Sequence, residues 1–423
     1  MKRKNLGILA LAAVVLTLTL SACAGQEAQT ADGDTAKQEI TVMLPDWGAP
    51  TDEMLANFES ETGIKVNLQR TGWDEIKQKV SVASAGNNAA ADVFEVDWSW
   101  VGEFQSAGWL EPLDIPQEVI DDTPSLAYFM VDGKYYALPY INDMRLAYSN
   151  TAMLNEAGID TVPTNWTELE QGFDALASSG VNEHPFLFPL NAEEKTTTSF
   201  LTLAYTRNNI IFNEDGSINH ESALDALQVI EHMVEAGYID PMSVSTPGID
   251  VFKGIQNGNG AYLAGPSSYV TSTNNPEVST VVGQVEAIPF PGKDGIATSS
   301  ISFTEAIGIS AFSENKQAAQ TFVEWYMEPE TQKELNHEIS IMPTRTSVLE
   351  EMITSGELDA PEFIIEQSQQ VTSPFPNGVP KYYTQMSTEI FNIVNQLGQG
   401  KIDAEQAADA MVEKVDALIA NNQ

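Results

Sequence analysis

The feature that most constrains the fold is a regular alternation of strand-like and helix-like segments near the start of the chain. Short apolar or alternating segments predict strands at 40–44, 64–68 and 92–96. Capping residues and helical spacing predict helices at 52–61 and 75–85, and another helix after the third strand. This order predicts a mostly parallel α/β sheet. Ligands bind such sheets beyond the carboxyl ends of the strands.

Aromatic and acidic side chains follow two of these strands. Trp47 lies in the loop after the first strand, and the cluster Asp97-Trp98-Ser99-Trp100 follows the third. The face of a tryptophan ring can pack on the apolar C–H face of a sugar, and a carboxylate accepts hydrogen bonds from hydroxyls. A single tryptophan is more often a core residue, so core packing is the alternative. Their concentration at one edge of the sheet favours a sugar site.

The stretch 133–150 contains two strand-like segments separated by polar residues. Asp132-Gly133 is a hairpin-turn dipeptide. Strands are predicted at 135–139 and 144–148, on either side of Asn142-Asp143. A strand that stops on two polar residues and resumes is compatible with a segment that crosses between two lobes. Taken alone, the stretch favours an ordinary hairpin.

The N-terminal residues read as an export signal. A basic start at residues 2–4 precedes an apolar run at 6–20, which is shorter than the roughly 20 residues that a membrane span needs. The run ends in Leu20-Ser21-Ala22-Cys23, which resembles a bacterial lipobox. We therefore expect a signal peptide at 1–22, a lipidated Cys23 and a polar tether to residue 38. A plain secretory peptide is the alternative, and no later segment is long and apolar enough to span a membrane.

The charge and the motif content exclude several classes of function. With 20 Lys and Arg against 60 Asp and Glu, the net charge is −40, so the chain repels phosphate backbones and we expect no nucleic-acid partner. The sequence contains no Gly-x-Ser-x-Gly elbow, no His-Glu-x-x-His motif and no phosphate loop. We expect no cofactor, no metal and no enzymatic activity. A glycoside hydrolase needs only two facing carboxylates, and counting acidic residues leaves that alternative open.

The later part of the chain predicts more of both element types. Strands are expected at 186–189, 261–263 and 285–289, and a polar segment at 191–198 follows the first of them. Helices are expected at 222–236 and 316–326, and the C-terminal part is expected to be helical with a break near Gly398-Gln399-Gly400.

Nine fragments in a fixed order carry a resemblance to a known family. They are FESETGIKV at 58–66, ADVFEV at 91–96, GKYYALP at 133–139, LAYSN at 146–150, PTNWTE at 163–168, IPFPG at 288–292, AIGI at 306–309, AAQTFVEW at 318–325 and MPTR at 342–345. Together, behind a lipobox, they make the chain resemble the extracellular solute-binding proteins of carbohydrate ABC importers, the maltose- and multiple-sugar-binding group. The order and spacing are specific for the family and much less specific for the sugar.

The resemblance implies a two-lobed α/β periplasmic-binding-protein fold of type II. The N-terminal lobe would comprise 39–141 plus 301–345, and the C-terminal lobe 142–300 plus 346–423. These discontinuous lobes would be joined by a hinge at Asn142-Asp143. The family closes its lobes over a ligand, and a few hinge residues absorb the motion.

The resemblance also implies a set of ligand-binding residues. By position these are Trp47, Trp73, Asp97, Trp98, Asn142, Asp143, Asn191, Glu193, Glu194, Ser267, Phe303, Glu305 and Tyr383. Asn142 stands where maltose-binding protein has a hinge glutamate, and Ser267 replaces a frequent stacking tryptophan. The chain departs from the maltose-type pattern at both positions.

The function implied is that of a monomeric receptor, lipid-anchored through Cys23 on the outer side of the cell membrane. It would capture a sugar or an oligosaccharide and deliver it to a membrane permease. The same fold could instead bind a cationic solute such as a polyamine, or a peptide. A surface adhesin without a role in transport is a further alternative.

Overall fold

The computed structural model describes residues 38–422 of the 423-residue chain. The predicted signal peptide, Cys23 and the tether up to residue 37 lie outside the described residues. None of the helices in the described part of the chain is long and apolar enough to cross a membrane.

The first sheet has five strands in the order β2-β1-β3-β11-β6. They are β1 (Gln38–Leu44), β2 (Ile64–Arg70), β3 (Val93–Asp97), β6 (Leu138–Ile141) and β11 (Glu305–Ile309). Strand β1 pairs in parallel with β2 and β3, whereas β11 runs antiparallel to its neighbours β3 and β6. The carboxyl ends of β1, β3 and β6 therefore lie at the same edge as the start of β11.

Helices cover this sheet, and their ends follow from local sequence. They are α1 (Asp52–Thr62), α2 (Trp73–Ala85), α3 (Val101–Ser106), α4 (Gln117–Asp122), α11 (Lys316–Tyr326), α12 (Pro329–Ile339) and the 3-10 turns η1 (Asp46–Gly48) and η2 (Pro124–Phe129). The Thr51 side chain accepts a hydrogen bond from the Met54 amide at 3.3 Å and so caps α1. Gly63 ends α1 with φ of 74°, a conformation that glycine adopts without strain.

The second sheet has four strands in the order β10-β7-β9-β8. They are β7 (Arg145–Asn150), β8 (Phe186–Leu187), β9 (Tyr262–Pro266) and β10 (Val285–Ile288). Arg145 at the start of β7 lies opposite Pro266 at the end of β9, because these two strands are antiparallel. This sheet thus presents the start of β7 and the end of β9 at one edge.

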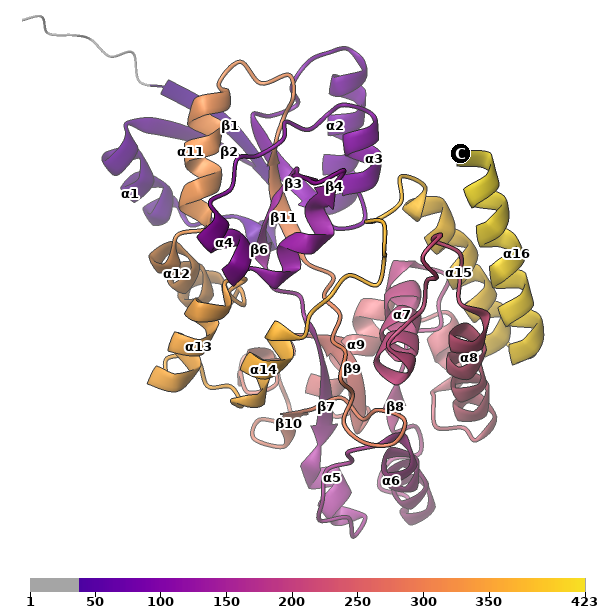
Figure 1. The fold of residues 1–423 in the computed structure, drawn as a ribbon. Helices are drawn as coiled ribbons and strands as arrows, with labels where there is room; N and C mark the ends of the chain where they lie inside the picture. The colour runs from indigo at the N-terminus through magenta and orange to yellow at the C-terminus, as the bar shows by residue number, and fades with distance from the viewer. Residues whose placement is uncertain (1–37, 423) are drawn as a thin grey trace, which may run out of the picture. The chain divides into compact units, whose positions relative to one another are not determined.

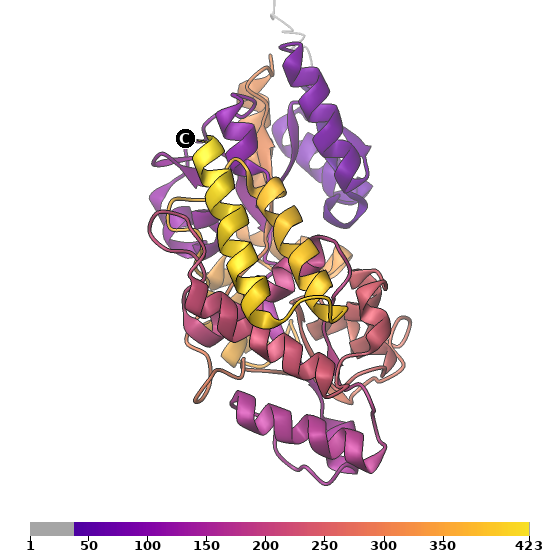
Figure 2. The ribbon, with the colours of Figure 1, turned by 90° about the vertical axis from the view of Figure 1, so that its right-hand side faces the viewer.

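The remaining helices lie between the strands of the second sheet in sequence or in the C-terminal segment that follows α12. They are α5 (Thr151–Glu156), α6 (Trp166–Ser179), α7 (Glu194–Asn208), α8 (His220–Glu235), η3 (Pro241–Val244), α9 (Gly248–Asn257), α10 (Tyr269–Ser272), α13 (Thr346–Ser355), α14 (Phe363–Gln369), α15 (Tyr383–Gly398) and α16 (Ala404–Asn422). Helices α15 and α16 pack side by side, and both contact α8 (Figure 2).

Two chain segments that connect the two sheets lie beside each other, and Met342 contacts the first of them. The chain leaves the first sheet at Ile141 and enters the second at Arg145 (Figure 1). The return segment pairs with it: the Arg145 amide donates to the Ile301 carbonyl at 2.9 Å, and the Phe303 amide donates to the Asp143 carbonyl at 3.0 Å. On another side, the Asn142 amide donates to the carbonyl of Met342 at 3.0 Å. The predicted two-lobed α/β fold is confirmed by the likeness to known two-lobed proteins described below, while the residue limits of the lobes stay a prediction.

One local prediction was wrong, and one helix was not predicted. The predicted strand at 135–139 is divided: β5 (Lys134–Tyr135) pairs with β4 (Met130–Val131) in a hairpin, and β6 starts only at Leu138. The turn itself is as predicted, with positive φ at Asp132 and Gly133. The unpredicted helix is α7, which begins inside the polar segment at 191–198 and whose residues 196–206 are all buried.

Candidate functional site

The predicted site residues gather where the edges of the two sheets meet the crossing segments. Trp47 follows β1, Asp97 ends β3, and Glu305 begins β11 directly opposite Asp97 in register. On the second sheet, Ser267 follows β9 and donates a hydrogen bond from its hydroxyl to the Asn142 carbonyl at 2.6 Å. The parallel pairing of β1 and β3 brings the loops that follow Leu44 and Asp97 to the same edge of the sheet.

A group of carboxylates lies at this edge. Glu305 accepts a hydrogen bond from the Trp47 indole nitrogen at 2.5 Å. Asp97 accepts two hydrogen bonds from Ser99, at 2.8 Å from the amide and 2.5 Å from the hydroxyl. Behind them, Glu95 is fully buried and accepts a hydrogen bond from Tyr140 at 2.6 Å, while its other oxygen has no partner among the described residues.

These carboxyl groups hold their protons unusually tightly. Burial, followed by the nearby Asp97 charge, raises the pKa of Glu305 from 4.5 to about 8. Burial raises the pKa of Asp97 to about 6, although hydrogen bonds from Ser99 and from the Trp73 indole oppose the rise. The pKa of Glu95 is also raised, by burial and then by the charge of Glu305. Each ionised group makes ionisation of its neighbours less favourable.

The C-terminal part contributes a second buried carboxyl environment. Glu194, at the start of α7, accepts hydrogen bonds from the Tyr383 hydroxyl at 2.6 Å and the Ser387 hydroxyl at 2.5 Å. Burial raises the pKa of Glu194 to about 7, against the effect of these two donors, and Asp97 raises it further. The influence of Asp97 on Glu194 indicates that carboxylates of the two parts face the same region.

An aromatic cluster joins the two parts at Trp98. Its ring centroid lies 4.6 Å from that of Tyr383 and 4.9 Å from that of Phe303. Tyr128 and Phe375 complete the cluster at 6.3 Å and 5.9 Å. Trp98 is only 3% exposed, whereas Trp47 is 48% exposed. Trp98, Phe303 and Tyr383 are therefore covered by one another in this arrangement, and Trp47 presents the open ring face.

The crossing segment carries a buried ion pair. Arg145 is 5% exposed and contacts Asp143 at 3.2 Å. Its guanidinium also lies 4.8 Å from the ring centroid of Phe303. Burial raises the pKa of Asp143, while the Arg145 charge opposes the rise. The sequence prediction missed Arg145, although a cation inside an otherwise apolar strand segment was a usable signal.

Three further predicted site residues have contacts that hold the surrounding structure together. Glu193 accepts a hydrogen bond from the Gly248 amide at 2.5 Å, at the start of α9. Asn191 bonds within its own turn: its side chain accepts from the Ala192 amide at 2.9 Å. Trp73 packs on Trp100, with ring centroids 4.6 Å apart, while its indole reaches Asp97. Their roles in binding stay a prediction.

The chemistry available at this edge is hydrogen bonding and ring stacking. Carboxylates accept bonds from hydroxyls or ammonium groups, and the exposed indole of Trp47 offers a flat apolar face. Within residues 38–422, no cluster of three or more His, Cys, Asp or Glu side chains has the geometry to hold a metal ion.

Comparisons with known proteins find a family and relatives that this chain resembles. The sequence profile of the family described as bacterial extracellular solute-binding protein matches residues 44–333. A chain of Brucella abortus (strain 2308) named as a binding protein is 26% identical over 328 residues, covering 75% of this chain and 77% of its own length. The maltooligosaccharide ABC transporter solute-binding lipoprotein of Streptococcus pneumoniae serotype 4 is 22% identical and covers 96% of this chain and 95% of its own.

A solved structure has the same fold. The sugar-binding protein MalE from Xanthomonas citri superposes with a TM-score of 0.76 at 21% identity, over 91% of this chain and 98% of that one. At this level of identity the likeness establishes the fold.

Proposed function

We propose that this chain, which belongs to the bacterial extracellular solute-binding protein family, captures a sugar or oligosaccharide and delivers it to the permease of an ABC importer. The observation that carries the proposal is the meeting of the exposed Trp47 with the carboxylates Asp97 and Glu305 at the edge of the first sheet. Relatives named for maltooligosaccharide and sugar binding support the choice of a carbohydrate.

The residues at this edge have complementary tasks in the proposal. Trp47 would stack on the C–H face of a pyranose, as its exposed ring allows. Asp97 and Glu305 would accept hydrogen bonds from sugar hydroxyls, and these bonds favour the ionised carboxylates that burial opposes. Binding would therefore lower the pKa of both groups.

Access to the inner part of the site requires movement. Trp98 and Tyr383 cover each other at 4.6 Å, and Lys77 donates to the Thr384 hydroxyl at 3.0 Å nearby. A solute that reached these rings would have to separate these contacts first. A ligand can favour reclosing only by contacting both sides, which is how the proposed receptor would signal that it is loaded.

A cationic solute is the second candidate, and the carboxylates favour it. Glu95, Asp97, Asp143, Glu194 and Glu305 all have raised pKa values with burial as the first cause. A bound polyamine would place positive charge beside these buried carboxyl groups and favour their ionised forms, and tryptophan faces also attract cations. The relatives' names favour the sugar over the polyamine, and the experiment below separates them.

The test is a thermal-shift screen of the chain from Gln26 onward against sugars, polyamines and peptides. A ligand that binds only the folded chain stabilises it by about 2.7 kcal/mol at 100 times its Kd. We expect a shift with one class of sugar and no turnover of that sugar by chromatography. A shift with polyamines alone would replace the sugar by a cation, and turnover of a glycoside would refute a pure binding role.

Two variants locate the binding. Trp47→Ala should weaken the binding of the sugar by about tenfold, the upper range for an aromatic stacking contact. The fold should stay intact, because the side chain is half exposed. Val82→Ala is the control, since Val82 is an exposed apolar residue on α2. Equal affinities of the two variants would move the site away from Trp47.

The cellular setting belongs to the same proposal. We propose that the chain works as a monomer without nucleic-acid partners, anchored by a lipid on Cys23 at the outer side of the cell membrane. A relative named as a lipoprotein supports the anchor. Cys23→Ser should release the protein from the membrane fraction, and mass spectrometry of the N-terminal peptide should find acyl chains on the unaltered protein only. An unmodified Cys23 in the membrane fraction would refute the anchor.

A further inference from the structure

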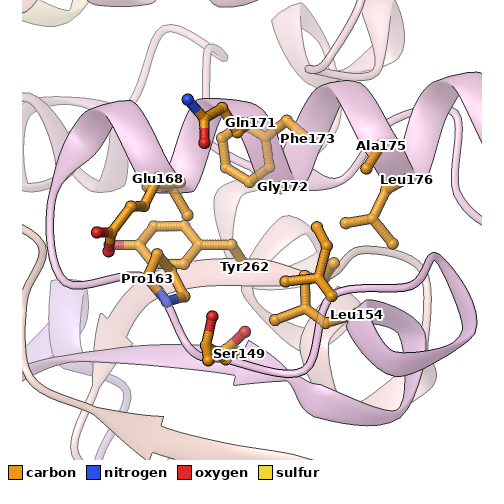
Figure 3. A pocket seen from close by; sticks show the side chains of 14 residues that line it. Ser149, Leu154, Pro163, Glu168, Gln171, Gly172, Phe173, Ala175, Leu176 and Tyr262 are labelled. Carbon is orange, nitrogen blue, oxygen red and sulfur yellow. The ribbon is translucent and has the colours of Figure 1, made fainter.

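A pocket separate from the proposed sugar site lies under helix α6. Its volume is about 210 Å³, and it is lined by residues of α5, α6, the loop between them, β7 and β9. The walls are mostly apolar, with Leu154, Ile159, Leu169 and Leu176 among them. Figure 3 shows α6 along one side and Ser149 and Leu154 on the opposite side. An apolar cavity of about 150 Å³ holds a benzene ring, so this one has room for a substituted ring.

Two hydroxyl groups line the pocket without a bonding partner. Tyr262 is 2% exposed, as is Ser149, and neither hydroxyl forms a hydrogen bond with any residue in the described range 38–422. Burial alone raises the pKa of Tyr262. In Figure 3 the hydroxyl end of Tyr262 points toward the side of the pocket formed by Pro163 and Glu168. Neither hydroxyl is among the fully covered polar atoms of the described residues that lack a partner, so both are reached through the pocket and can bond a guest molecule.

A glycine in the middle of α6 keeps the pocket open. Gly172 is buried within α6, where glycine is the least favourable residue apart from proline. A Cβ at this position would lie 3.7 Å from Leu154 Cδ2 and 3.8 Å from Ile159 Cδ1, both ordinary contact distances. No clash therefore requires glycine here. What the missing side chain provides is space between α6 and these two pocket residues.

We propose that this pocket binds a small neutral molecule with an apolar ring and one hydroxyl group, a cyclic or aromatic alcohol. The ring would fill the space next to Gly172, and its hydroxyl would bond to the hydroxyl of Tyr262. The exposed residues Glu168 and Gln171 lie at the mouth, so a neutral guest meets no desolvated charge inside. The site lies in the C-terminal part and uses none of the residues assigned to the sugar.

The test uses benzyl alcohol and toluene as probes on the chain from Gln26 onward, labelled at leucine and isoleucine methyl groups. Benzyl alcohol should shift the NMR signals of Leu154, Ile159 and Leu176 in a saturable way. Tyr262→Phe should weaken the binding of benzyl alcohol about fivefold and change the binding of toluene by less than twofold, because only the alcohol loses a hydrogen-bond partner. The proposal fails if these methyl signals do not move, or if both probes respond equally to Tyr262→Phe.

Substitutions that fill the pocket provide an independent test of the proposed site. Gly172→Leu should abolish binding of both probes, and Gly172→Ala, which introduces no clash, should weaken both. Ser178→Leu places the same side chain on the exposed side of α6 and should bind the probes like the unaltered chain. Unchanged binding by Gly172→Ala and Gly172→Leu would overturn the assignment.

Discussion

Replacing Glu305 by glutamine should stabilise the fold at alkaline pH and leave it unchanged at acid pH. Glutamine keeps the shape and the acceptor oxygen that the Trp47 indole needs, and removes the charge that faces Asp97. The folded-state pKa of Glu305 is about 8, compared with an ordinary 4.5, so the folded chain retains this proton where the unfolded chain has lost it. Stability of the unaltered chain therefore falls as pH rises from 4.5 to 8.

The size of the effect follows from the two pKa values. Each pH unit between them is worth about 1.4 kcal/mol, which gives an upper limit of about 5 kcal/mol. Because the side chain is only partly buried, water screens its charge, and we expect about 2 kcal/mol. The free energy of unfolding of Glu305→Gln should be higher than that of the unaltered chain by this amount above pH 8, and the two should be equal below pH 4.5.

Urea unfolding from pH 4.5 to 9 measures this difference. Glu413→Gln removes one exposed acid from α16 and serves as the control for net charge. The free energy of unfolding of this control should change with pH in the same way as that of the unaltered chain. If Glu305→Gln shows the same pH dependence as well, the raised pKa of Glu305 and its repulsion by Asp97 are refuted.

Three further substitutions test a close backbone approach, an ion pair and a helix cap. Gly102→Ala would place a Cβ 2.2 Å from the Val379 carbonyl, so we expect a loss of about 1–3 kcal/mol in urea unfolding, and a neutral result would contradict this close approach. Arg145→Leu removes the Arg145 charge beside Asp143 and should cost about 3 kcal/mol at pH 8. Because the pKa of Asp143 is raised, the cost should shrink as the pH falls toward 4 and the carboxyl takes up a proton, and equal losses at pH 8 and pH 4 would exclude the ion pair as the cause. Thr51→Ala should cost about 1 kcal/mol through loss of the α1 cap, whereas Thr51→Ser should restore it, and equal stability of the two variants would argue against capping.

Local chemistry made much of the fold predictable. The cap at Thr51 and the left-handed Gly63 set the ends of α1 where the sequence placed them. Helix α7 was missed because residues 196–206 are buried on all sides, which removes the periodicity that marks a half-buried helix. Its threonine-rich start also has weak helix preference, so tertiary burial decides its conformation.

The site was only partly predictable for a related reason. Strand order places Trp47 and Asp97 at one edge, as the alternation of strands and helices implied. Glu305, which only the family resemblance had indicated, lies opposite Asp97 at the same edge. Sequence does not reveal that Trp98 packs against Tyr383, because the two residues are distant in the chain and meet only through tertiary structure. The same holds for Arg145, whose role depends on Phe303 arriving from the return segment.

The position of β11 has a consequence for how the protein is made. This strand lies between β3 and β6, yet about 160 residues separate the end of β6 from its start. A ribosome adds about 5–20 residues per second, so roughly 10–30 s pass between the synthesis of β6 and that of β11. Throughout this interval the sheet lacks the strand that joins β3 to β6, and neither can complete its pairing. The order of strands thus keeps the growing chain unfinished while the middle of the protein is synthesised.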